Sequence, residues 1–455
     1  MITYSIIQKS QLECAHRLDA EFFQPEYLEL EKRLTKTNRY KKWGDIEGEF
    51  ITGPFGSEFK VENYVTDGKF RYVRGKDVKS FFLMDDDNVY IPQEDFNRLK
   101  KFYLEKGDIL VSVVGTLGNS AIVDTSTLPA IFSCKSTVFR SKKINPYYFI
   151  AYLNSRYGRG FLERNARGAV QTGLNIDDLR LLPLFIPPDE KQEMISSIII
   201  EVKKGLDHSK LYYSQAENLL LEELGLKNFK PQEDLAWVVN LSEVQKAKRI
   251  DAEFFQPKYE EIISKFKTQM LKLEDLVLIK KGIEVGSEQY QEVGRPFIRV
   301  SNLTKLGIVA ADAKLINDKL YQRFKNDYEP KIGEILLTKD ASPGIAYVFK
   351  EAMEGIIAGG ILRLKIKAKI EAEYLALVLN STIGQMQMER DTGGSVIIHW
   401  RPEQIKNCLI PILPKSIQQK IAALIRKSHT ARKKSKELLE QAKQKVEQLI
   451  EQGAQ

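Results

Sequence analysis

The sequence predicts a mixed α/β protein with an internal pseudo-twofold repeat, made of two tandem domains and two long helices. Two observations support this prediction. Residues 15–27 (AHRLDAEFFQPEY) and 247–259 (AKRIDAEFFQPKY) are identical at ten of thirteen positions and lie 232 residues apart in a chain of 455. Each copy also closes with a long stretch of helical periodicity that follows a proline. One supersecondary plan is therefore used twice.

Each copy is expected to open with a helix. Pro25 and Pro257 suit the first helical position, and apolar residues recur at helical spacing after both, as Tyr27 and Leu30 do in the first copy. Strand-like segments follow between Gly, Asp and Asn turns, among them FRYVRG, NVYIP, DILVSVVG and CKSTVFR. A further helix is predicted from Pro146 to about residue 157. Each copy is thus a loop-rich α/β domain of roughly 180 residues.

Shorter matches extend the repeat along both copies while the sequence between them diverges. The matched pairs are 107–112 (GDILVS) with 333–338 (GEILLT), 153–155 with 379–381 (both LNS), and Pro187 and Gln192 with Pro414 and Gln419. The conserved spacing of these pairs indicates that the two domains share one order of elements.

Two long helices are predicted at residues 189 to about 224 and 415 to about 453, where apolar residues form stripes at helical spacing. Residues 188–230 hold six lysines and eight acidic residues, whereas ten lysines and arginines and four glutamates follow from Lys415 onward. Opposite net charge favours pairing of the helices as an antiparallel coiled coil. Two unrelated amphipathic helices with solvated polar faces are the alternative.

The composition permits a polyanionic partner without demanding one. Lysine and arginine number 69 against 61 acidic residues, a net charge of +8. Cys14, Cys134 and Cys408 are odd in number and far apart, which favours neither disulfides nor a zinc site and fits a reducing cytoplasm. No apolar run approaches the ~18 residues needed to span a bilayer, and the start of the chain does not resemble a secretion signal. We therefore expect a cytoplasmic protein without a membrane partner.

No pattern in the sequence predicts a catalytic or metal site. Residues 145–148 (NPYY) are close to the Asn-Pro-Pro-Tyr of adenine-N6 methyltransferases, but the second proline is missing and the second copy has EAEY at 371–374. The glycine runs lack the lysine that binds phosphates, and the four histidines show no ligand spacing. The Lys339-Asp340 pair is too common on surfaces to indicate a nuclease, and the first copy has Val113-Val114 there.

The repeated chain resembles the specificity subunit of type I restriction–modification enzymes. The resemblance covers essentially the whole chain and rests on RxDAEFFxPxY at residues 17–27 and 249–259, and on the proline-initiated helices after Pro187 and Pro414. It implies two target-recognition domains, 1–187 and 231–413, that each read one half of a bipartite, asymmetric double-stranded DNA target. The helices at 188–230 and 414–455 would set the gap between the half-sites and dock two methyltransferase subunits.

The resemblance also implies that this chain has no catalytic residues and needs no cofactor of its own. The complex would methylate adenine N6 and cleave DNA through methyltransferase and restriction subunits, which would hold S-adenosylmethionine, ATP and Mg. Two other functions remain open from the residues alone. One is a stand-alone methyltransferase or nuclease, and the other is a coiled-coil scaffold with no DNA role.

The repeat itself suggests where partners and DNA would bind. Segments that are nearly identical between copies should meet identical partners, so docking is predicted at Arg17, Asp19, Phe22, Phe23, Arg249, Asp251, Phe254 and Phe255. DNA binding needs Lys and Arg on phosphates, and Arg, Lys, Asn, Gln or His on base edges, in loops that differ between copies. The candidates are Arg71, Arg74, Lys76, Lys79, Arg164, Arg167 and Gln171 in the first copy, and Arg299, Ser301, Asn302, Lys339, Arg390, His399 and Arg401 in the second.

Overall fold

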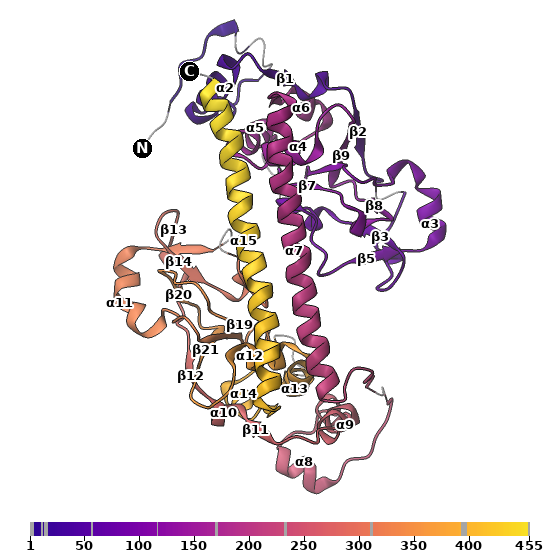
Figure 1. Cartoon of the computed structure of the whole chain (residues 1–455), viewed down its shortest axis with the longest axis vertical. Coiled ribbons are helices and arrows are strands. Elements are labelled where there is room, and N and C mark those ends of the chain that lie inside the picture. The colour runs from indigo at the N-terminus through magenta and orange to yellow at the C-terminus, as the bar shows by residue number, and fades with distance from the viewer. Residues whose placement is uncertain are drawn as a thin grey trace. The chain divides into compact units, whose positions relative to one another are not determined.

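The chain forms two compact units (Figure 1). The computed structural model describes residues 4–10, 12, 17–55, 58–115, 117–168, 172–231, 234–309, 313–392 and 398–453. Met1–Gly205 with Lys433–Gln455 make the first unit, and Leu206–Arg432 make the second. The boundary falls inside both long helices, α7 (Asp189–Glu223) and α15 (Lys415–Gly453). The sequence predicted two domains and two separate long helices, whereas in the structure each unit contains one domain together with part of α7 and part of α15.

The first unit contains a five-stranded sheet of order β2-β9-β6-β7-β4, a three-stranded sheet of order β5-β3-β8, and the pair β1-β10. Its strands are β1 (Tyr40–Lys42), β2 (Glu49–Thr52), β3 (Phe70–Val73), β4 (Phe81–Phe82), β5 (Val89–Ile91), β6 (Ile109–Ser112), β7 (Ser120–Ile122), β8 (Ala130–Phe132), β9 (Ser136–Arg140) and β10 (Pro183–Phe185). Its shorter helices are α2 (Pro25–Lys36), α3 (Gln93–Arg98), α4 (Pro146–Leu153), α5 (Arg156–Asn165) and α6 (Ile176–Leu181).

The second unit contains sheets of order β12-β21-β18-β19 and β13-β17-β14-β20, with the pairs β11-β22 and β15-β16. Its strands are β11 (Met270–Lys272), β12 (Val277–Lys281), β13 (Tyr290–Gln291), β14 (Arg295–Ile298), β15 (Leu303–Thr304), β16 (Gly307–Ile308), β17 (Lys314–Ile316), β18 (Ile335–Thr338), β19 (Ala346–Val348), β20 (Ile356–Ile357), β21 (Ile361–Ile366) and β22 (Leu409–Pro411). Its shorter helices are α8 (Leu241–Ala247), α9 (Pro257–Ser264), α10 (Leu273–Leu276), α11 (Asp318–Tyr328), α12 (Ala372–Asn380), α13 (Thr382–Thr392) and α14 (Pro402–Lys406).

The repeat predicted from sequence extends to the strand order. The run β2-β9-β6-β7 matches β12-β21-β18-β19, and β5-β3-β8 matches β17-β14-β20, with a parallel pair at the end of each. The matched GDILVS and GEILLT segments begin with Gly107 and Gly333, which both have φ +91°, a conformation that glycine adopts readily. The predicted fold class, a mixed α/β chain with two repeated domains and two long helices, is confirmed.

A buried acid follows each of these glycines and fixes the sheet to the turn. Asp108 accepts a hydrogen bond from Arg140 Nε at 2.8 Å, and Glu334 accepts one from Arg363 Nε at 2.8 Å. Both arginines lie on the strand beside the acid, β9 and β21. Because a buried charge is costly without a partner, each pair is stable only when strand and turn are both in place.

The helix predicted from Pro146 to about residue 157 is two helices, α4 and α5, and the same break occurs between α12 and α13. Asn154 is the C-cap of the first helix, and Ser155 caps the second by accepting a hydrogen bond from Gly158 N at 3.4 Å. A Cβ on Gly158 would lie 2.2 Å from Tyr152 O, and one on Gly384 would lie 2.3 Å from Leu379 O. The chain therefore turns too tightly here for one continuous helix.

The starts of the long helices are built alike. Gln192 Nε2 donates to Pro187 O at 3.1 Å, and Gln418 Nε2 donates to Leu413 O at 2.9 Å. Gln418, rather than the predicted Gln419, is thus the counterpart of Gln192. The sequence match of Pro187 and Gln192 with Pro414 and Gln419 was wrong by one residue, because Pro414 corresponds to Pro188.

Each half of α7 contacts a half of α15 within its own unit. In the first unit Lys434 Nζ lies 2.7 Å from Glu201 Oε1, and Ser435 Oγ donates to Val202 O at 3.2 Å. In the second unit Ser428 Oγ donates to Ser209 O at 2.7 Å. The predicted contact between the helices is therefore present, while their packing as a coiled coil stays a prediction. Among the residues that the structure describes, no helix is long and apolar enough to cross a membrane.

Candidate nucleic-acid interface and docking segments

The RxDAEFF segment of the first unit holds itself in place through two arginines and one phenylalanine ring. Arg17 donates to both oxygens of Asp19 at 2.8 and 2.5 Å, which lowers the pKa of that carboxyl. The guanidinium carbons of Arg17 and Arg164 lie 4.6 and 4.1 Å from the centre of the Phe22 ring. Arg164 Nε also donates to Phe22 O at 2.9 Å. We call this arrangement the arginine clamp.

The second unit repeats the arginine clamp. Arg249 donates to both oxygens of Asp251 at 2.8 and 2.5 Å, and the Phe254 ring has Arg249 and Arg390 at 4.5 and 4.6 Å. Arg390 Nε donates to Phe254 O at 3.1 Å. An arginine beside an aromatic face contributes about 0.5–2 kcal/mol, depending on its exposure, so these contacts stabilise each clamp.

The clamps change how the predicted residues are interpreted. Arg164 is only 6% exposed, and its bonds to Phe22 and Glu31 use it within the domain, so we no longer count it as a DNA contact. Phe23 and Arg17 are buried as well. The sequence interpretation did not include the residue between Arg and Asp of each clamp among the candidate docking residues. This residue is Leu18 in the first unit, which is 85% exposed, and Ile250 in the second, which is 90% exposed. The signal available in the sequence was an aliphatic residue kept at this place in both copies.

The basic segment of the first unit is largely neutralised by acidic neighbours. Arg71 is buried and bonds to Met84 O, and burial lowers its pKa. Arg74 donates to both oxygens of Asp77 at 3.0 and 2.9 Å, and Lys76 Nζ lies 2.8 Å from Asp87. Residues 85–87 are all aspartate, and the sequence interpretation did not pair them with this turn.

The corresponding turn of the second unit has the same backbone and different side chains. Arg299 N donates to Asn302 Oδ1 at 3.0 Å, as Arg74 N donates to Asp77 Oδ2 at 2.9 Å. Asn302 is buried and also donates to Val309 O at 3.2 Å, so it belongs to the turn itself. Ser301 is exposed.

The exposure of the predicted DNA contacts therefore divides them into groups. Arg71, Arg164 and Asn302 are buried and bonded inside their units, and we remove them from the DNA contacts for that reason. Arg74, Arg299 and Arg390 are half-buried, and Lys339 is buried. Gln171 lies outside the described residues. The exposed candidates are Lys76, Lys79, Arg167, Ser301, His399 and Arg401.

One polar cluster gathers three residues of the second unit at a loop. Lys339 Nζ lies 2.5 Å from Asp340 Oδ2, and His399 Nδ1 lies 2.8 Å from Asp340 Oδ1. Burial by itself raises the pKa of Asp340, but the bonds from His399 and Lys339 outweigh it and lower the pKa. The His399 side chain is 58% exposed. The cluster therefore combines a fixed carboxylate with an accessible imidazole.

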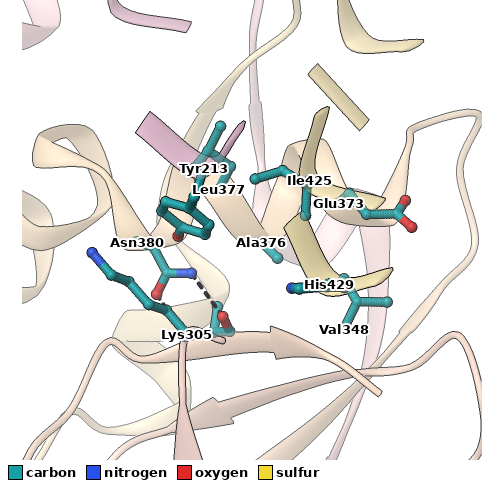
Figure 2. A pocket seen from close by; sticks show the side chains of 10 residues that line it. Tyr213, Lys305, Val348, Glu373, Ala376, Leu377, Asn380, Ile425 and His429 are labelled. Atoms are coloured by element: carbon teal, nitrogen blue, oxygen red, sulfur yellow. Dashed lines mark hydrogen bonds between the residues drawn. The ribbon is translucent and has the colours of Figure 1, made fainter. Parts of the chain in front are cut away.

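Neither of two hollows in the surface has the features of an active site. The cavity in Figure 2, lined among others by Tyr213, Lys305 and His429, has a volume of about 10 Å³, room for one water molecule. An open hollow of about 320 Å³ lies beside Asn145. Asn145 Oδ1 accepts hydrogen bonds from Tyr147 N and Tyr148 N at 3.0 and 3.3 Å, so it caps α4. Within the described ranges, no group of three or more His, Cys, Asp or Glu side chains could hold a metal ion.

Comparison with known proteins gives both sequence and structural matches. The family model described as the type I restriction modification DNA specificity domain matches residues 48–211 and 266–448, one match in each copy. The S subunit of the type I restriction–modification system of M. genitalium is similar at 14% identity and a TM-score of 0.43, covering 91% of this chain and 95% of that one. The HsdS subunit of Thermoanaerobacter tengcongensis is similar at 14% identity and a TM-score of 0.28, covering 91% and 96%. Because the family model matches most of the chain, this protein belongs to the type I restriction modification DNA specificity family.

Proposed function

We propose that this chain is the DNA-recognition subunit of a type I restriction–modification complex and that each domain reads one half of a bipartite, asymmetric target. The observation that carries the proposal is the family match, which falls once on each copy of the repeat. The copies share strand order and buried ion pairs but differ in exposed loop residues. Such a difference is expected of two domains that read different base sequences.

Two methyltransferase subunits would dock on the repeated RxDAEFF segments and on the long helices. Each arginine clamp holds an aliphatic side chain in water between two bonded residues, Leu18 in the first unit and Ile250 in the second. A rigidly held apolar side chain suits contact with a partner, and its presence in both copies suits two copies of one partner. Leu18 and Ile250 are therefore added to the predicted docking residues.

Methylation of adenine N6 and cleavage of DNA are assigned to partner subunits, the methyltransferase and restriction subunits. These partners would hold S-adenosylmethionine, ATP and Mg²⁺. Within this chain the nearest match to a methyltransferase motif begins at Asn145, whose side chain is used as a helix cap. The reading of DNA, rather than its chemistry, is thus the role that the residues support.

Methylation mapping tests the proposed function. Cells that express this chain with its methyltransferase subunit are expected to carry N6-methyladenine in one bipartite motif whose two half-sites differ. A matched culture that expresses the methyltransferase subunit alone is the control and is expected to lack the motif. Methylation without sequence preference, or methyl transfer by the purified chain without a partner, would refute the proposal.

A further inference from the structure

The polar cluster of the second unit occupies a place whose backbone is the same in the first unit. Lys339 N donates to Gly360 O at 2.9 Å, and Trp400 N donates to Lys339 O at 2.8 Å. In the first unit Val113 N donates to Lys135 O at 2.9 Å, and Leu174 N donates to Val113 O at 3.0 Å. Lys339 therefore corresponds to Val113, and Trp400 to Leu174.

The next residues correspond in the same way. Asp340 pairs with His399 in a β-bridge, as Val114 pairs with Gly173. The second unit thus carries a carboxylate and an imidazole at a bridge where the first unit has only aliphatic side chain and glycine. Because the backbone is the same and the charged side chains differ, the two domains can bind different groups at this place.

A second exchange of side chains occurs beside the cluster. A Cβ on Gly75 would lie 2.8 Å from Lys135 Cβ, and a Cβ on Gly360 would lie 2.8 Å from Val300 Cγ2. Gly75 and Lys135 face each other in the first unit, and Val300 and Gly360 face each other at the corresponding positions of the second unit. The glycine is thus at the first position in one unit and at the second position in the other. The first unit therefore has the exposed Lys135 where the second unit has Gly360, whose added Cβ would lie 3.5 Å from Asp340 Oδ2.

The backbone at the cluster is strained, which supports a role in binding. Ala341 has φ +60°, and its counterpart Gly115 has φ +89°. Glycine adopts this conformation freely, whereas alanine does so at a cost of order 1 kcal/mol. The second unit keeps an unfavourable residue directly after Asp340, and strain of this kind is concentrated at functional sites.

The hydrogen bond to Asp340 fixes the chemistry of His399. An ionised carboxylate only accepts hydrogen bonds, so Nδ1 of His399 must carry the proton. In the neutral imidazole Nε2 is then an acceptor, and among the described residues the structure records no bond to it. The bases that donate in the major groove are adenine, through N6, and cytosine, through N4.

We propose that the Lys339–Asp340–His399 cluster reads one base of the half-site bound by the second domain, with His399 Nε2 accepting a hydrogen bond from the exocyclic amine of adenine or cytosine. The inference rests on the proposed function, since it names the base chemistry that one domain recognises. Lys339 holds the carboxylate that orients the imidazole, so it acts as a positioning residue. The first domain lacks this acceptor and would read its half-site through other groups.

The experiment uses the complex of the full chain with its methyltransferase subunits and measures methylation rates on duplexes that carry each of the four bases at every target position. His399→Ala is expected to lower the rate on the best target by about 5- to 150-fold and to equalise the bases at one position of the second half-site. Asp340→Asn is expected to relax the same position. His399→Gln keeps an acceptor and is expected to retain the preference for an amine-bearing base.

The exposed Ile332, which lies in the same unit outside the cluster, supplies the control Ile332→Ala, and this variant is expected to keep the full target. Unchanged base discrimination in His399→Ala would overturn the inference, as would an equal loss on every duplex or a change in the first half-site. A wild-type complex that methylates without sequence preference would instead overturn the proposed function, so the two failures are distinguishable.

Discussion

Each guanidinium of the two arginine clamps makes several bonds at once, which determines how these arginines are used. Arg164 covers the Phe22 ring, donates to Phe22 O and lies 2.8 Å from Glu31. Arg390 covers Phe254 and lies 2.8 Å from Glu260. A planar group with five donors can make this set of bonds, whereas a lysine cannot. Residue type alone therefore could not separate scaffold arginines from arginines available to DNA.

His429 is the residue whose titration should affect stability. It is half-buried on α15, lines the cavity of Figure 2 together with Lys305 and Glu373, and has both ring nitrogens buried. The centre of the Tyr347 ring lies 5.5 Å from the imidazole, and the charges of Lys350 and Arg432 act on it. Burial and the positive charge of Lys350 lower the pKa of His429 from 6.5 to about 4. The unfolded chain thus takes up a proton near pH 6.5, while the folded chain resists it until near pH 4.

Stability from His429 is fully present above pH 6.5 and is lost as the pH falls toward 4. Between pH 7 and pH 5 we expect the wild-type chain to lose roughly 2 kcal/mol of unfolding free energy from this residue. His429→Gln removes the titration, so its loss over the same interval should be smaller by that amount. Urea unfolding at both pH values measures this difference. An equal loss of unfolding free energy between pH 7 and pH 5 in the two proteins would contradict it.

At the scale of elements, local signals in the sequence predicted what depends on local structure. The proline at Pro25 and the apolar periodicity of residues 189–224 and 415–453 correctly indicated α2, α7 and α15. The break after α4 was missed because it depends on the close approach of Gly158 to the carbonyl of Tyr152. Such a contact leaves no periodic pattern in the sequence. Strand order was also beyond the sequence, since β3 and β8 pair across a long stretch of chain.

The candidate site was predicted less well than the fold, for a related reason. The repeated RxDAEFF segment was found by identity between copies, but its internal bonds to Arg164 and Arg390 cross more than a hundred residues. Asp77 and Asp87 pair with Arg74 and Lys76 in the turn where DNA contacts were predicted. Both effects depend on tertiary contacts, so the sequence could not show which of the predicted side chains are exposed.

The two long helices carry a prediction at this scale, because the boundary between the compact units falls inside both. Under the proposed function they set the gap between half-sites. Four residues inserted into each helix, after Gly205 and after Arg432, add about 6 Å of helix, close to two base pairs. Methylation mapping should show a changed gap and unchanged half-sites.

The control for this prediction replaces four residues at each place without changing helix length, and it should leave the gap as it is. A lengthened variant that keeps the original gap would show that the helices do not set it. Loss of all methylation, with the lengthened chain still folded by circular dichroism, would count against the same idea.

At the scale of the whole molecule, one structural plan appears twice with two kinds of difference between the copies. The clamps, the acid–arginine pairs and the starts of the long helices are the same in both units. The loop cluster at Asp340 differs from its counterpart at Val114. Under the proposed function, the parts that the copies share would meet two copies of one partner, and the parts that differ would read different DNA sequences. The pattern of similarity would then divide the surface into docking and reading regions.

Partner stoichiometry tests the docking region. Leu18→Asp and Ile250→Asp each place a charge where an apolar contact is proposed, and each should weaken one docking site by roughly 2 kcal/mol or more, about 30-fold. Native mass spectrometry of the purified complex is expected to show two methyltransferase subunits on the wild-type chain, one on each single variant and none on the double variant. Both side chains are exposed, so circular dichroism should be unchanged.

Val293→Asp is the matched control, since Val293 is an aliphatic residue that is also 83% exposed, and it should keep both methyltransferase subunits. Retention of two subunits by both single variants would remove Leu18 and Ile250 from the docking region. Loss of both subunits in one single variant would show that the two sites are not independent. Either result would leave the reading of DNA to be judged separately, because in the second unit the residues of the arginine clamp and those of the Asp340 cluster are different.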